Sequence, residues 1–159
     1  MQFTSPTDGL LSLEDIFNAI IDFVKYDPDS QYRLIVGTDS HPGIEEVAFV
    51  TAIVIYRVGR GGRFFYHKEK VGLNVDLKVR IFHEVSRSLK VASNLTEIIA
   101  KEEEYTKNMD IEIHIDVGEN GPTSEIIKEV VGMVVGSGYE AMIKPDSYAA
   151  SSVADKYTK

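Results

Sequence analysis

Residues 32–71 read YRLIVGTDSHPGIEEVAFVTAIVIYRVGRGGRFFYHKEKV, and this stretch decides the fold. It contains three runs rich in branched and aromatic residues, 32–38, 47–58 and 63–71, separated by Pro42 and Gly43 and by the GRGG sequence at 59–62. Apolar runs bounded by turn residues are typical of strands. The pattern predicts a meander of three consecutive antiparallel strands.

Helical periodicity flanks this meander on both sides. Before it, apolar residues recur every three or four positions over 12–25, and Ser12 and Asp15 have the spacing of a capped helix start. After it, Asp76 is expected to cap a long helix that runs to about Tyr105. The remaining segments predict a strand over 111–117, a helix over 124–135, a strand over 139–143 and a closing helix over 147–157.

This order of elements predicts an α/β fold. Three antiparallel strands followed by two that alternate with helices form a mixed five-stranded sheet, and right-handed crossovers place helices on both of its faces. The 159 residues suit one domain, 1–159, in which residues 1–30 form an N-terminal helical extension.

Charge and composition bound the function. The net charge is −8, yet residues 32–92 carry ten Lys and Arg against six acids, so a local basic face for nucleic acid and an ordinary solvated face are both compatible with the sequence. Trp is absent, so Tyr and Phe would supply any base stacking. The absence of Cys excludes disulfides and thiolate chemistry.

Targeting features are also missing from the sequence. Residues 1–10 lack the features of a signal peptide, and the longest nearly apolar run, 47–56, is shorter than the roughly 20 residues of a membrane-spanning helix. We expect a cytoplasmic protein without a membrane partner, and the sequence does not predict its oligomeric state.

Two aspartates come at the ends of predicted strands. Asp39 follows the first strand, and Asp116 lies at the end of the fourth, before a glycine-rich turn. If these strands are neighbours, the two carboxylates lie side by side, where a cation or a shared proton must stabilise them. Either residue taken alone is equally compatible with a plain turn.

Two further acids lie on predicted helices. Glu84 lies between apolar Ile81 and Val85 on the long helix, and Asp155 lies on the closing helix. A solvent-exposed position without function is the ordinary alternative for each. Asp76 is a competing candidate for the site acid on the long helix, although its expected role as the helix cap already accounts for an aspartate there. Gathered by the fold, Asp39, Glu84, Asp116 and Asp155 would form a divalent-metal site.

The chain resembles the ribonuclease H-like superfamily. The resemblance lies in the order of four acidic motifs, and it covers residues 31–159, with the first helix outside the core. The motifs are GTDS at 37–40, HEV at 83–85, IDV at 115–117 and ADK at 154–156. More narrowly, VGTDSH at 36–41 and HIDVG at 114–118 are similar to the bacterial YkuK-type family of predicted ribonuclease H-related nucleases.

This resemblance implies a two-metal nuclease that acts on RNA, an RNA/DNA hybrid or structured DNA. Two Mg²⁺ or Mn²⁺ ions would activate water and stabilise the leaving oxygen. In this interpretation Asp39 bridges both ions, Glu84 and Asp116 complete one shell, and Asp155 holds the second ion. His41 and His114 would assist product release or orient a carboxylate, although a packing or surface role is the more common one for a lone histidine.

Two alternatives remain from the sequence. The first is a non-catalytic ribonuclease H-like module that binds nucleic acid or protein through the basic middle region. The second is an ATPase of the actin and sugar-kinase type, for which GTDS at 37–40 is only a loose phosphate-loop motif. The sequence ENGP at 119–122 is compatible with a phosphate-contacting loop and, more simply, with a turn between strand and helix.

Overall fold

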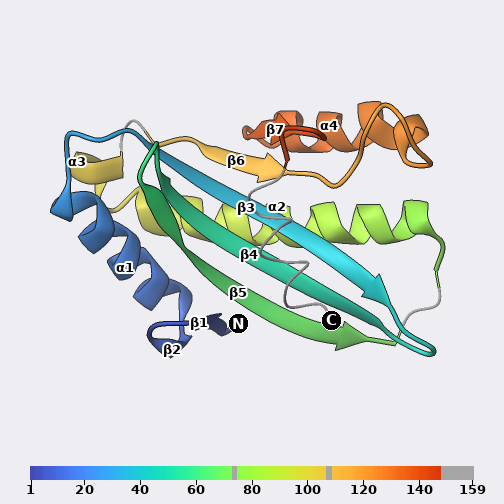
Figure 1. Cartoon of the computed structure of the whole chain (residues 1–159), viewed down its shortest axis with the longest axis horizontal. Helices are drawn as coiled ribbons and strands as arrows, with labels where there is room; N and C mark the ends of the chain where they lie inside the picture. The colour runs from blue at the N-terminus through green and yellow to red at the C-terminus, as the bar shows by residue number, and fades with distance from the viewer. Residues whose placement is uncertain (73–74, 107–108, 148–159) are drawn as a thin grey trace.

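The protein forms a seven-stranded mixed sheet with helices packed against it (Figure 1). The structure is a computed structural model that describes residues 1–72, 75–106 and 109–147. The strand order is β2-β1-β5-β4-β3-β6-β7, antiparallel except for the parallel pairs β3–β6 and β6–β7. The strands are β1 (Phe3–Ser5), β2 (Gly9–Leu11), β3 (Tyr32–Pro42), β4 (Val47–Arg57), β5 (Gly61–Val71), β6 (Ile111–His114) and β7 (Glu140–Met142). The mixed α/β class is confirmed, with seven strands in place of the expected five.

The predicted meander is the centre of the sheet, but its first strand is longer than expected. β3 pairs with β4 in unbroken register from Tyr32↔Arg57 to Pro42↔Val47, so residues 39–42 belong to the strand and not to a turn. The small and polar residues at 37–40 are typical of a strand end, which explains the wrong prediction, but their backbone pairing with β4 continues. Glycine is required at the start of β5, where a Cβ on Gly62 would lie 2.3 Å from the carbonyl oxygen of Ile55.

The N-terminal residues are not a purely helical extension. β1 and β2 form a short hairpin, and β1 joins the main sheet through Thr4↔Tyr66. Phe3 is completely buried in the core. Strands of three residues are too short to show an alternating pattern, which explains why the sequence did not predict them.

The predicted helices that lie before residue 148 are present, with different ends. Ser12 and Asp15 form the expected capping box, and the Asp76 carboxylate accepts the backbone N–H of Val79 at 3.0 Å. The long helix stops before the charged run KEEE at 101–104, which offers no apolar face to bury. The helices are α1 (Leu13–Tyr26), α2 (Leu77–Ile99), α3 (Glu103–Thr106), the 3₁₀ turn η1 (Ser124–Ile126) and α4 (Ile127–Gly136).

The main hydrophobic core lies between the sheet and one layer of helices. Side chains of α1, α2 and α4 join those of β3, β4 and β6 in a single buried cluster, as Ile16, Val85, Val130, Leu34 and Ile53 illustrate. On the opposite face a smaller cluster contains Ile35, Ala52 and Val54. The three longer helices described, α1, α2 and α4, therefore share one face, whereas helices were expected on both faces. The closing helix predicted over 147–157 lies outside the described residues from 148 onward.

No helix within the described ranges has the length and hydropathy required to cross a membrane.

Candidate functional site

The candidate site lies where the parallel pairing of β3 and β6 ends. The last paired residues are Gly37 and His114, and Asp39 and Asp116 each follow two residues later. The two strands are neighbours, which is the arrangement that places these two carboxylates at one edge. Asp39 is still within β3, since that strand continues along β4 after β6 has ended.

Three of the four predicted acids line one small pocket. This pocket of about 220 Å³ is bordered by Asp39 from β3, Glu84 from α2 and Asp116 after β6. Its remaining lining comes from Arg80, Lys144 and the turn at 118–123, among others. The fourth acid, Asp155, lies outside the described residues.

Glu84 is the most unusual acid of the pocket because it is only 4% exposed. The Ser40 hydroxyl donates to its Oε2 at 2.5 Å, whereas Oε1 is buried without a hydrogen-bond partner among the described residues. Burial is the main reason why the pKa of Glu84 is raised to about 8. The charges of Asp39 and Asp116 contribute to this increase, while the Ser40 hydrogen bond and Arg80 oppose it. The charged form of Glu84 therefore lacks sufficient stabilisation from the protein alone.

Two cations accompany these acids, and the sequence did not single out either of them as a site residue. Lys144 Nζ lies 2.9 Å from Asp116 Oδ1. This hydrogen bond raises the pKa of Lys144, and the charges of Asp39 and Glu84 add to the shift. Arg80 lies one turn before Glu84 on α2 and also lines the pocket. Neither belongs to a motif, so only the three-dimensional arrangement reveals them.

Buried hydroxyls fix α2 against β3 beside the pocket. Thr38 Oγ1 lies 2.8 Å from Ser88 Oγ and 3.0 Å from Thr51 Oγ1. Ser88 is one helical turn after Glu84, and Ser40, two residues after Thr38, contacts Glu84 itself. These successive contacts set the position of the Glu84 carboxylate relative to the strand that carries Asp39.

The donor set fits a hard divalent cation in its chemistry. Carboxylate oxygens are the ligands that Mg²⁺ and Mn²⁺ prefer, and the unpartnered Oε1 of Glu84 is a buried acceptor in need of a positive partner. Within the described part of the chain, however, no three Asp, Glu or His side chains converge closely enough to hold a metal ion. Asp39, Glu84 and Asp116 would therefore have to turn toward one another to share a cation.

The remaining sequence candidates lie elsewhere or have other partners. His114 is buried beside Glu112, with Nε2 3.4 Å from the Glu112 carboxylate, and His41 is exposed near the end of β3. Asp76 caps α2, as expected. Of the ENGP turn, residues 120–122 border the pocket, so that turn does face the carboxylates.

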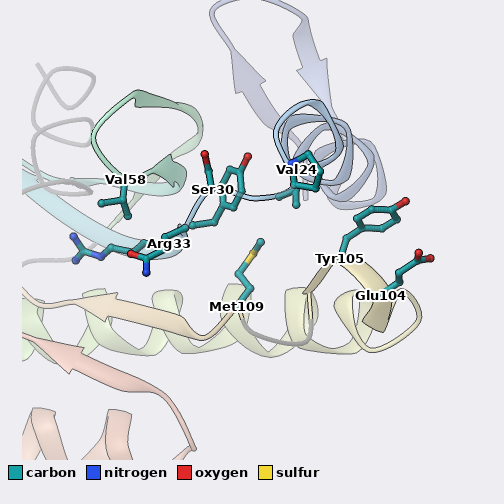
Figure 2. Close-up of a pocket in the computed structure, with 10 residues that line it drawn as sticks. Val24, Ser30, Arg33, Val58, Glu104, Tyr105 and Met109 are labelled. Atoms are coloured by element: carbon teal, nitrogen blue, oxygen red, sulfur yellow. The ribbon is translucent and has the colours of Figure 1, made fainter.

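A larger hollow lies at the other end of β3. It measures about 850 Å³, and Figure 2 shows Val24 of α1, Tyr105 of α3 and Met109 converging on it. Arg33 borders this hollow, but its guanidinium is engaged by Glu112 through bonds of 2.7 and 2.6 Å. Only one acid, Glu104, lines the hollow among the described residues, so the smaller carboxylate pocket is the better candidate for metal chemistry.

Comparisons with known proteins show the family of the chain. The family model described as ribonuclease H-like matches residues 15–159, a range that includes most of α1 and so extends beyond the expected resemblance. The uncharacterized protein YkuK of Bacillus subtilis (strain 168) is 30% identical over 166 aligned positions, covering 99% of this chain and 96% of that protein. No solved structure matches the chain significantly.

Proposed function

The chain belongs to the ribonuclease H-like family, and from this premise we propose that it is a metal-dependent nuclease that hydrolyses phosphodiester bonds. The observation that carries the proposal is the pocket in which Asp39, Glu84 and Asp116 meet from three different elements. A buried carboxylate with an unpartnered oxygen has no structural advantage, so a role with a bound cation is the simplest reason for it.

The chain supplies the protein part of such a mechanism. Asp39, Glu84 and Asp116 would hold Mg²⁺ or Mn²⁺, with Asp155 as the fourth proposed ligand. Cations bound there would activate a water molecule and stabilise the leaving oxygen of a phosphodiester. Ser40 orients the Glu84 carboxylate through its hydrogen bond to Oε2. Arg80, whose side chain borders the same pocket, offers a positive charge to substrate phosphates.

The family indicates a nucleic-acid substrate in general, and we propose RNA, an RNA/DNA hybrid or structured DNA. The basic residues of the chain are concentrated in 32–92, the stretch that contains β3, β4, β5 and most of α2. If these side chains form a basic surface, it would favour binding to a phosphate backbone despite the negative net charge.

A second candidate is a ribonuclease H-like module that binds nucleic acid or protein without cleaving. The Lys144–Asp116 ion pair favours it, because the protein itself already neutralises one of the proposed ligands. An ATPase role receives no such support. Residues 37–40 are paired with β4 in regular strand register, whereas a phosphate loop requires an open turn of backbone N–H groups.

The test is a cleavage assay with labelled RNA, DNA and hybrid duplexes in Mg²⁺ and in Mn²⁺. We expect the wild type to cleave at least one of these substrates and Asp39→Asn to lose at least about a hundredfold in rate, since it removes a proposed ligand. Asp22→Asn is the matched control, because Asp22 is an exposed acid of α1. Cleavage that persists in Asp39→Asn, or no cleavage of any substrate by the wild type, would contradict the nuclease proposal.

A further inference from the structure

Lys144 is built into the carboxylate pocket by its backbone. It follows β7, and its backbone N–H donates to the carbonyl oxygen of Val117 at 2.9 Å. The turn after Asp116 leaves space for its aliphatic stem, because a Cβ on Gly118 would lie 3.3 Å from Lys144 Cβ and 3.5 Å from Cδ. The root of this side chain is thus fixed beside the acids, while the side chain as a whole is 60% exposed.

The ammonium of Lys144 competes for an atom that a metal ion would need. Nζ lies 2.9 Å from Asp116 Oδ1, which is one of the oxygens facing the pocket that Asp39 and Glu84 also line. A carboxylate oxygen that is paired with an ammonium is a weaker ligand for a second cation, since the ammonium already neutralises part of its charge. A metal ion that binds Asp116 through this oxygen therefore competes with Lys144.

The cost of displacing Lys144 from Asp116 is small. The side chain of Lys144 is 60% exposed and that of Asp116 31% exposed, so water replaces the lost contact readily. Exposed ion pairs typically contribute about 0–1 kcal/mol, which is the scale of a severalfold change in affinity. A divalent cation with further carboxylate ligands has more than enough attraction to displace one ammonium.

We propose that Lys144 is an internal counter-ion that pairs with Asp116 when the pocket holds no metal and is displaced when a divalent cation binds. This inference rests on the metal-binding part of the proposed function. It gives Lys144 two roles: its charge lowers the repulsion among the acids of the empty pocket, and its competition weakens the affinity of the pocket for metal.

The test measures Mn²⁺ affinity by calorimetry without any nucleic acid, so that it does not depend on cleavage. We expect Lys144→Met to bind Mn²⁺ about two- to fivefold more tightly than the wild type, because the competing ammonium is gone. Lys70→Met is the matched control. Lys70 is also 60% exposed and also pairs with an acid, Glu46, at 3.7 Å, but it lies on β5. This control should bind Mn²⁺ as the wild type does.

Two further variants separate competition from a general effect of charge. Lys144→Arg keeps a cation that reaches Asp116 and should leave Mn²⁺ affinity within about twofold of the wild type. In an Asp116→Asn background, Lys144→Met should have no effect, since the pair that it breaks no longer exists. A gain in affinity that persists in this background would overturn the proposal.

The outcomes distinguish this inference from the proposed function. Tight or moderate Mn²⁺ binding that Lys144→Met leaves equal to Lys70→Met would overturn the counter-ion role and leave the metal site intact. No Mn²⁺ binding by either the wild type or Lys144→Met would overturn both. Binding by Lys144→Met alone would support the counter-ion role in its strongest form.

Discussion

Two buried acids, Glu112 on β6 and Glu84 on α2 beyond the end of the β3–β6 strand pair, have opposite electrostatic environments. Near the start of the pair, Arg33 and His114 surround Glu112; burial alone would raise the pKa of Glu112, but their hydrogen bonds outweigh it and hold the pKa at about 2. Beyond the other end, burial raises the pKa of Glu84 to about 8. The first acid forms a structural ion pair, whereas the second forms no ion pair with any described residue.

This difference shows where an acid has a function beyond stability. Glu112 lies in β6 opposite Ile35, and the fold supplies its guanidinium partner from the adjacent strand. Glu84 has a hydroxyl on one oxygen and no described partner on the other. The comparison predicts that substitution of Glu112 harms folding, whereas substitution of Glu84 harms metal binding and spares or improves stability.

The largest expected effect on the free energy of unfolding comes from substitution of Glu112. Glu112→Gln replaces the carboxylate with an amide that cannot stabilise the Arg33 guanidinium, and we expect a loss of about 3 kcal/mol in the free energy of unfolding. The measurement is urea denaturation at neutral pH. Glu69→Gln is the control, since Glu69 pairs with Arg87 at 2.5 Å in a more exposed setting, and it should cost less than about 1 kcal/mol. Equal losses in the two variants would show that Glu112 is not a special structural pair.

A smaller effect of opposite sign is expected at Glu84 as the pH rises. Because its pKa in the folded state is about 8, against 4.5 for an ordinary glutamate, the folded state binds more protons than the unfolded state between these values. The contribution of Glu84 to stability therefore falls from about pH 4.5 to pH 8. Glu84→Gln removes this loss, so its stability relative to the wild type should rise by about 2 kcal/mol between about pH 6 and about pH 7.5.

Urea denaturation of both proteins at the acidic and alkaline ends of this window measures the effect, because groups that do not interact with Glu84 contribute equally to both proteins. A stability difference between the wild type and Glu84→Gln that stays constant with pH would mean that Glu84 ionises normally. The contrast with Glu112 would then disappear.

The smallest effect concerns the neutral contacts that hold α2 beside the pocket. Ser88→Ala removes one hydrogen bond to Thr38, which keeps Thr51 as a partner, and we expect a loss of about 1 kcal/mol. Ser137→Ala is the control, because the Ser137 hydroxyl is exposed and bonds only within its own helix turn. Thermal denaturation compares the two. A Ser88 variant as stable as the Ser137 variant would show that the hydroxyls do not fix α2.

The sequence predicted the parts of the fold whose signal is local. The meander, the capped starts of α1 and α2, and the glycine-rich turn after Asp116 all depend on residues close together in the chain. The hairpin of β1 and β2 was not predicted, because its strands have three residues each, too few to show an alternating pattern. The end of β3 was misplaced because polar residues of a strand that lines a site look like turn residues.

The candidate site was predictable only in its acids. Asp39, Glu84 and Asp116 stood out because acidic residues beside buried apolar runs are unusual, and all three line one pocket. Lys144 and Arg80 carry no such signal, since charged residues are ordinary on any surface. The partnership of Arg33 with Glu112 joins residues that lie 79 positions apart, so only the strand pairing reveals it. Asp155 remains a prediction, outside the described residues.

The most direct test of the central claim is a calorimetric titration of Mg²⁺ and Mn²⁺ into the wild type and into the Asp39→Asn/Asp116→Asn variant. The account predicts that the wild type binds divalent metal and that the double variant, which removes two of the three carboxylates lining the pocket, does not. Absence of metal binding by the wild type, even with nucleic acid present, would contradict the account and leave the non-catalytic binding module in its place.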